Sequence, residues 1–310
     1  MISYFLIYLL SLLMPLPNNE PDPKVSRGTL FVKQDFPSEF VTPRNIYIWV
    51  PENYDPRGAY PVLYMHDGQM LFDSTATWNQ QAWDIDITVQ QLIDEKKIPA
   101  CIIVGIANTV DRYSEYFPQE AYQILNKEEQ EDLMASLRYG EPMFHKPICS
   151  DDYLKFMIEE LKPFIDEHYA TAQGTENTFI AGSSMGGLIS MYAFFEYPEV
   201  FGGAACLSTH WTGIFVQNDH IPNAFLSYMS TKKDLLHGRR LYFDHGTETL
   251  DTLYEVHQRK VDKLFHENST GIDTGYMSRK FEGTGHTERA WKERFAIPLN
   301  FLIGNKTHQK

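Results

Sequence analysis

Residues 178–187 read Thr-Phe-Ile-Ala-Gly-Ser-Ser-Met-Gly-Gly, and this stretch decides the fold of the chain. Its first four residues form a short apolar run that predicts a buried strand, and the residues from Gly187 onward predict a helix. The turn between them places Ser184 two residues after Gly182 and two before Gly186. Glycines at these positions let neighbouring backbones approach closely. We therefore predict that Ser184 lies on a tight, strained turn between a strand and a helix.

The pattern Gly-x-Ser-x-Gly between a strand and a helix is typical of the nucleophile elbow of α/β-hydrolases. The helix after the serine points its N-terminal amides at the oxygen that becomes negative during acyl transfer. By itself the motif is weak evidence, because with 19 glycines in 310 residues chance supplies it in roughly one chain of twenty. Its place directly after a predicted strand gives it weight, and we predict Ser184 as a nucleophile.

Short β-branched and aromatic runs alternate with longer helical patterns along the rest of the chain. Strands are predicted at 29–36, 45–50, 62–66, 101–106, 178–181, 203–207, 241–244 and 276–281. Helices are predicted near 85–96, 153–168, 187–195, 252–266 and 289–302. This alternation predicts an α/β fold with a mostly parallel, twisted sheet of about eight strands and helices on both faces. The first two strands have no helix between them, so they should form an antiparallel edge.

A nucleophilic serine needs a base, and the base needs an acid that orients it. In α/β-hydrolases the acid and then the histidine follow the serine, each on a loop after a later strand. His286 fits the base, because it lies in a glycine-flanked loop between the last predicted strand and the last predicted helix. The loop after the 241–244 strand contains two carboxylates that fit the acid, Glu248 and Asp251.

The choice between these two carboxylates depends on the length of their loop. Asp251 could instead be only an N-cap of the helix that follows, and Glu248 could reach back from the Gly246-Thr247 turn with its longer side chain. We favour Asp251 as the acid, because the chain needs length after this turn before it can approach the serine again. Glu248 remains the alternative acid.

The second half of an oxyanion hole should come from the loop after an early strand. A His-Asp-Gly-Gln segment follows the third predicted strand and supplies a glycine turn there. We predict that the backbone amides of Met185 and of Gln69, or of Gly68, form the oxyanion hole. His66 and Asp67 are predicted to brace this loop and not to take part in the chemistry.

Four segments together resemble the putative-esterase family, namely residues 62–69, 112–117, 181–187 and 283–291. The resemblance covers roughly residues 29–303, and the family includes carboxylesterases, siderophore esterases, feruloyl and acetylxylan esterases, and mycolyltransferases. It implies Ser184 as nucleophile and His286 as base, with an acid after a Gly-Thr turn. Some siderophore-cleaving relatives work with a Ser–His dyad, so the resemblance implies activity even without an acid.

The resemblance also points to residues of the substrate pocket. Arg112 and Tyr113 fall where relatives shape that pocket, and the alternative for both is a surface salt bridge and packing. His210 and Trp211 follow the strand after the elbow helix, on the side where ligands bind in such sheets. We predict that Trp211 lines the acyl or alcohol pocket.

The composition excludes several classes of protein. A net charge of −14 and the absence of a basic run argue against a nucleic-acid partner, because phosphate binding needs clustered Lys and Arg. The three cysteines form no disulfide framework, and neither C-x-x-C nor H-E-x-x-H occurs, so no metal site is predicted. The predicted chemistry needs neither a metal nor an organic cofactor.

Two segments depart from this pattern. Residues 1–20 are apolar up to Leu13 and then proline-rich, which resembles a signal peptide, with a retained anchor or a buried helix as alternatives. We predict cleavage and export, no stable membrane insertion afterwards, and one domain over 21–310 in a secreted or periplasmic protein. Residues 117–150 are too long for an ordinary loop, and they form either a lid over the site or a surface excursion.

The sequence thus predicts a serine carboxylesterase that works through an acyl-enzyme on a small-molecule or oligosaccharide ester. Siderophore lactones, feruloyl or acetyl groups on polysaccharide, and small soluble esters all fit this prediction. The alternatives are an acyltransferase with the same site, and a binding protein with a degenerate site. Intact Ser184 and His286 argue against the binding protein.

Overall fold

The computed structural model describes residues 22–266 and 275–304. The segment predicted as a signal peptide, residues 1–20, lies outside these residues. None of the described helices is long and apolar enough to cross a membrane.

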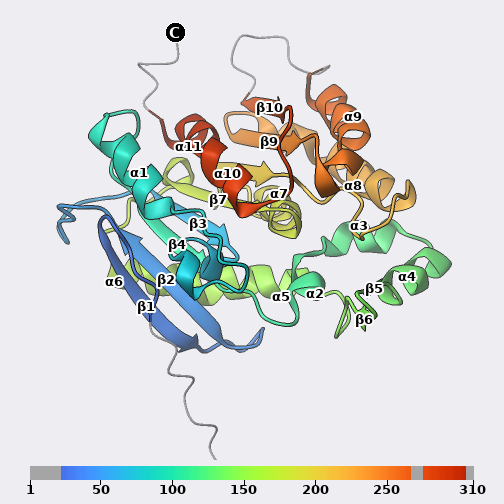
Figure 1. Cartoon of the computed structure of the whole chain (residues 1–310), viewed down its shortest axis with the longest axis horizontal. Coiled ribbons are helices and arrows are strands. Elements are labelled where there is room, and N and C mark those ends of the chain that lie inside the picture. The colour runs from blue at the N-terminus through green and yellow to red at the C-terminus, as the bar shows by residue number, and fades with distance from the viewer. Residues whose placement is uncertain (1–21, 267–274, 305–310) are drawn as a thin grey trace, which may run out of the picture.

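The fold is organised around one eight-stranded sheet (Figure 1). Its strands are β1 (Thr29–Phe36), β2 (Arg44–Val50), β3 (Val62–His66), β4 (Ile102–Ile106), β7 (Thr178–Ser183), β8 (Gly203–Leu207), β9 (Arg240–Gly246) and β10 (Tyr276–Phe281). They lie in the order β1-β2-β4-β3-β7-β8-β9-β10, and β2 is antiparallel to both of its neighbours. The pairs from β4 to β10 are parallel. The predicted α/β-hydrolase sheet and its antiparallel edge are confirmed.

Helices cover both faces of this sheet. One face carries α5 (Ser150–Lys155), a π-helical turn (Phe156–Leu161), α6 (Lys162–His168), α7 (Met185–Glu196), α8 (His220–Lys232) and α9 (Glu255–His266). The other face carries α1 (Ile85–Asp94), α10 (Glu288–Arg294) and α11 (Ala296–Ile303) (Figure 1). Successive residues of a strand point to opposite faces. In β3, accordingly, Val62 and Tyr64 join one apolar cluster, and Leu63 and Met65 join the other.

The helices differ from their predicted extents at three places. The predicted 153–168 helix begins at Ser150 and includes the π-helical turn, and the predicted 289–302 helix is two helices that meet at Phe295. The start of the predicted 252–266 helix is a 3₁₀ turn, η6 (Thr249–Leu253). The sequence analysis missed α8. A proline at its third position, Pro222, obscures the pattern, although proline is tolerated in the first turn of a helix.

The 117–150 segment is folded into the domain. It follows α2 (Arg112–Tyr116) directly. It contains α3 (Gln119–Ile124), α4 (Lys127–Met134) and a hairpin of β5 (Leu137–Arg138) and β6 (Glu141–Pro142). Phe117, Leu125 and Phe144 are buried in the main apolar cluster. The hairpin is exposed, and it lies with α3 and α4 to one side of the sheet (Figure 1). The segment is thus an anchored insertion with an exposed tip.

Candidate active site

Ser184 lies on the turn between β7 and α7 in a strained conformation, with φ +58° and ψ −122°. Its backbone N–H donates to the Leu207 carbonyl at 2.9 Å, which ties the turn to the neighbouring strand. A Cβ atom on Gly182 would lie 2.6 Å from the Gly186 carbonyl oxygen, so only glycine fits at Gly182. A positive φ is costly for a serine and is often found at functional sites. The predicted strained turn is present.

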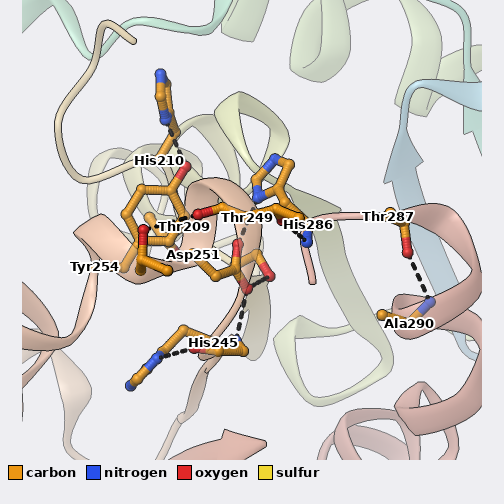
Figure 2. Close-up of polar contacts among 12 residues, drawn as sticks. Thr209, His210, His245, Thr249, Asp251, Tyr254, His286, Thr287 and Ala290 are labelled. Atoms are coloured by element: carbon orange, nitrogen blue, oxygen red, sulfur yellow. Dashed lines mark hydrogen bonds and ion pairs between the residues drawn. The ribbon is translucent and has the colours of Figure 1, made fainter. Parts of the chain in front are cut away.

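His286 and Asp251 form a hydrogen-bonded pair beside this turn. Nδ1 of His286 lies 2.6 Å from Oδ1 of Asp251, and Figure 2 shows the two side chains together. A carboxylate only accepts hydrogen bonds, so the imidazole proton must be on Nδ1 and Nε2 is left as an acceptor. The backbone N–H of His286 also donates to the Thr249 hydroxyl at 2.8 Å, which fixes the loop.

Of the two predicted acids, the structure pairs Asp251 with the histidine. The Asp251 side chain is fully buried within η6, whereas Glu248 is exposed. Asp251 does not act as an N-cap, because its carboxylate oxygens are used by His286, Ser208 and Gly246.

The surroundings of Asp251 keep its carboxylate charged. Burial alone would raise the pKa of Asp251, but hydrogen bonds from His286, Ser208 and the Gly246 amide outweigh burial and lower it. The Ser208 hydroxyl and the Gly246 N–H each donate to Oδ2 at 2.6 Å. The charged carboxylate can therefore stabilise an imidazolium that forms on His286.

Ser208 connects this carboxylate to a buried network that the sequence analysis missed. Its hydroxyl accepts hydrogen bonds from Trp291 Nε1 at 2.9 Å and from Arg294 Nη2 at 2.8 Å. Arg294 also forms a buried ion pair with Asp244 at 2.7 Å. The position of Ser208 directly after β8 places it at the edge of the sheet where the site lies, but it does not indicate these partners. The network holds the loops after β8 and β9 and α10 in one arrangement around Asp251.

The two predicted oxyanion residues line the cavity that contains Ser184. Met185 is the first residue of α7, so its N–H has no carbonyl partner one turn earlier in the helix. Gln69 lies in the short 3₁₀ turn η1 (Gly68–Met70) after β3. Gly68 packs instead against β4, where an added Cβ would lie 2.6 Å from the carbonyl carbon of Gly105. Gln69, and not Gly68, faces the cavity.

Asp67 and Arg112 brace the loop that carries Gln69. Asp67 has a left-handed backbone, and its carboxylate accepts two hydrogen bonds of 2.7 Å from the Arg112 guanidinium. Asn108 Nδ2 donates to the same carboxylate at 2.6 Å. Arg112 and Tyr113 also line the cavity, so both predicted alternatives for Arg112, the ion pair and the pocket wall, are seen.

His66 is a buried neutral side chain. Its Nδ1 lies 2.9 Å from the Tyr153 hydroxyl, and burial lowers its pKa to about 3. It does not line the cavity around Ser184. As predicted, His66 supports the structure and lies outside the site.

We expect His66 to make the fold less stable as the pH falls from about 6.5 toward 3. Between these values the unfolded chain binds a proton that the folded chain excludes, so protonation favours unfolding, and stability is complete only above 6.5. The free energy of unfolding should fall by at most about 1.4 kcal/mol per pH unit through this one group. Urea unfolding between pH 7 and 4.5 measures it, and His66→Gln should flatten the slope.

The matched control for this slope is His237→Gln, because His237 is exposed. It should leave the slope unchanged. A His66→Gln variant with the slope of the unmodified protein would contradict the prediction.

The prediction that Trp211 lines the substrate pocket is wrong. Trp211 is 1% exposed, its Nε1 donates to Gln258 Oε1 at 3.0 Å, and its ring packs against Phe243. His210 is also fully buried, with Nδ1 2.7 Å from the Tyr254 hydroxyl. The chain after β8 turns into the core at these residues and reaches the cavity only at Phe215.

The cavity has a volume of about 630 Å³, and aromatic rings form one part of its otherwise mostly polar wall. The rings come from the loop after β3, α2, the insertion, the loop after β8 and α10, and they belong to Trp78, Trp83, Tyr113, Tyr139, Phe215 and Trp291. A second cavity of about 740 Å³ adjoins it and shares Gln69, Met70 and Trp78. Among the described residues, no group of three His, Cys, Asp or Glu side chains is placed to hold a metal ion.

Residues 38–302 match the model of the family described as "Putative esterase". This match spans most of the chain. The chain belongs to the putative-esterase family. The predicted resemblance is confirmed, and the protein is a hydrolase that acts on ester bonds.

Individual relatives are similar over most of their length. The chain is 22% identical over 267 residues to the uncharacterized protein YbbA of Bacillus subtilis (strain 168), covering 84% of this chain and 93% of YbbA. It is 24% identical over 248 residues to the ferri-bacillibactin esterase BesA of the same organism, covering 78% of each. The solved structure of a ferulic acid esterase superposes with a TM-score of 0.62 at 16% identity, covering 89% of this chain and 98% of that chain.

Proposed function

We propose that the protein is a serine carboxylesterase in which Ser184, His286 and Asp251 form the catalytic triad. The observation that carries this proposal is the 2.6 Å hydrogen bond between His286 Nδ1 and the buried Asp251 carboxylate, next to a strained serine in the same cavity. No direct hydrogen bond joins Ser184 and His286 among the described contacts. In ligand-free active sites such bonds are often long and tighten when substrate binds.

In the proposed reaction, Ser184 Oγ attacks the ester carbonyl carbon while His286 Nε2 takes its proton. The carbonyl oxygen becomes an oxyanion and accepts hydrogen bonds from the Met185 and Gln69 amides. His286 then gives the proton to the leaving alcohol oxygen as the C–O bond breaks, which leaves an acyl group on Ser184. Water attacks the acyl-enzyme with the same assistance and releases the acid. Asp251 stabilises the imidazolium in both steps.

The test of this proposal combines labelling with turnover. A fluorophosphonate probe should label Ser184, as peptide mass spectrometry would show, and the same protein should hydrolyse 4-nitrophenyl acetate or butyrate. Adding a soluble alcohol separates hydrolysis from acyl transfer, because a transferase forms a new ester in place of the free acid. Labelling at another residue, or no turnover of any ester, would contradict the proposed mechanism.

We further propose that the natural substrate is a soluble ester with an aromatic part. The aromatic part of the cavity wall supports this, because flat rings pack well against Trp, Tyr and Phe side chains. The names of BesA and of the ferulic acid esterase give two candidate classes, a ferric siderophore and a feruloyl ester. A panel of model esters that includes a ferric siderophore and a feruloylated oligosaccharide compares them, and a preference for short aliphatic esters would contradict the proposal.

The hairpin of the insertion is proposed to limit the size of the substrate. Its tip residues Arg138 and Tyr139 line the cavity, and the Met143 N–H donates to the Ser136 carbonyl at 3.0 Å. Because these ends are adjacent, two glycines can replace residues 137–142 without moving the rest of the insertion. We expect the shortened protein to shift its preference among neutral 4-nitrophenyl esters toward longer acyl chains.

Labelling of Ser184 by a small fluorophosphonate should stay unchanged in the shortened protein. Lys127→Gln on α4 is the control, because this exposed residue belongs to the insertion and does not line the cavity. An unchanged chain-length preference after shortening would make the hairpin a surface feature only.

A further inference from the structure

The charges that line the cavity of Ser184 are unevenly paired. Asp67 and Arg112 neutralise each other through their two hydrogen bonds, and Glu288 accepts a hydrogen bond from Asn79. Arg138 also lines this cavity. Within residues 22–266 and 275–304, no Asp or Glu carboxylate forms an ion pair with it. Arg138 thus brings to the cavity a positive charge that no ion pair neutralises, and Glu288, whose partner Asn79 is neutral, brings a negative one.

The Arg138 guanidinium is held in place by aromatic neighbours. Its Nη1 donates to the Tyr113 hydroxyl at 2.5 Å, and its central carbon lies 4.4 Å from the Phe215 ring centroid and 5.2 Å from that of Tyr139. Cation–π contacts of this kind orient a guanidinium but do not neutralise it. Arginine has five N–H donors in a planar fork, so one bond to Tyr113 leaves donors for a further acceptor.

The position of this charge contrasts with the rest of the protein. The chain has a net charge of −14, so most of its surface repels anions. Burial lowers the pKa of His210, and the charges of Arg112 and Arg138 lower it further, against the opposite effect of Asp251.

We propose that Arg138 binds an anionic group of the substrate, such as a carboxylate, that is separate from the ester being cleaved. The planar fork suits two parallel hydrogen bonds to such a group. The rings of Tyr113, Tyr139 and Phe215 around it favour a flat arm between the anion and the ester. This inference rests on the proposed function, and it makes Arg138 a determinant of specificity and not of the chemical step.

The inference is tested with pairs of esters that differ only in charge. In the first pair, 4-nitrophenyl hydrogen adipate carries a carboxylate on the acyl side, and 4-nitrophenyl hexanoate is its neutral counterpart. In the second pair, 4-acetoxybenzoate carries the carboxylate on the alcohol side, and its methyl ester is the neutral counterpart. We expect kcat/KM to favour the anionic member of at least one pair by about tenfold, less at high salt because salt screens exposed charges. The pair that shows the preference tells which side of the ester Arg138 contacts.

Variants connect this preference to Arg138. Arg138→Gln should remove the preference by lowering kcat/KM for the anionic ester about tenfold, with little effect on the neutral one, and Arg138→Lys should restore most of it. Arg57→Gln removes the same charge at an exposed position that lines neither cavity, and it should keep the preference.

Two results would overturn the inference. One is equal kcat/KM for anionic and neutral esters in both pairs while the neutral esters are hydrolysed, which leaves the proposed function intact. The other is an Arg138→Gln variant that lowers both members of a pair equally. A protein that hydrolyses no ester and is not labelled at Ser184 would overturn the proposed function together with the inference.

Discussion

Replacing Ser184 by alanine is expected to lower kcat/KM for 4-nitrophenyl acetate by at least about 10³-fold. The substitution removes the oxygen that would attack the carbonyl, and neither His286 nor the backbone amides can replace it. The loss should appear in kcat, because the cavity that binds the ester stays the same. Circular dichroism and thermal unfolding should show a folded protein, since alanine fills less space on the same turn. Initial rates with subtraction of the uncatalysed reaction measure the effect.

The neighbouring serine offers a matched control. Ser183 is the last residue of β7, is slightly more buried than Ser184, and also lines the cavity. Ser183→Ala should keep most of the activity and all of the fluorophosphonate labelling. Normal turnover by a folded Ser184→Ala variant would refute the serine mechanism, and loss of labelling in Ser183→Ala alone would move the nucleophile by one residue.

The central strands of the sheet were predictable because they are buried on both faces. β3 and β8 begin and end where the sequence analysis placed them. Such strands read as continuous apolar or β-branched runs, which stand out from their surroundings. Helix α8 lacked a comparable signal, because a proline lies in its first turn and its apolar residues are interrupted by polar ones. In the insertion, α3 is only six residues long and has no side-chain cap, so it lacked a local signal as well.

The site was predictable where local geometry decides it. Glycine spacing, together with the predicted strand before it, placed Ser184 on its turn, because the close approach of Gly182 to Gly186 is a property of that one segment. Trp211 was misplaced because the direction of a side chain after a strand depends on how the following loop turns. Ser208 was missed because a lone serine has no sequence signal for a hydrogen bond to a residue 43 positions away.

The sequence favoured Asp251 over Glu248 only through the length of their loop, because both residues lie on the same loop after β9. The structure separates them through the 3₁₀ turn of η6, which directs Asp251 into the protein and leaves Glu248 exposed. The decisive contacts come from His286, Ser208 and Gly246, on three different segments. Such convergence appears only when the chain is folded.

Asp251→Asn is therefore expected to lower kcat by about 10⁴-fold, as when the catalytic histidine is held in the wrong tautomer. The amide of asparagine can still accept through its oxygen from Ser208 and the Gly246 N–H, which directs its NH₂ group toward His286 Nδ1. Nδ1 must then accept a hydrogen bond, so the imidazole proton moves to Nε2. Nε2 would carry a proton and could no longer take one from Ser184.

The matched control for this change is Glu248→Gln, which alters the exposed carboxylate three residues earlier on the same loop. We expect it to change kcat by less than about threefold, since solvent-exposed charges of this kind interact weakly with their surroundings. Thermal unfolding of both variants separates loss of activity from loss of structure. Mild effects from both changes would point to a Ser–His dyad, and a large effect from Glu248→Gln alone would give the role of the acid to Glu248. A 10⁴-fold loss in a folded Asp251→Asn variant, with Glu248→Gln active, is the result that the buried Asp251–His286 pair predicts.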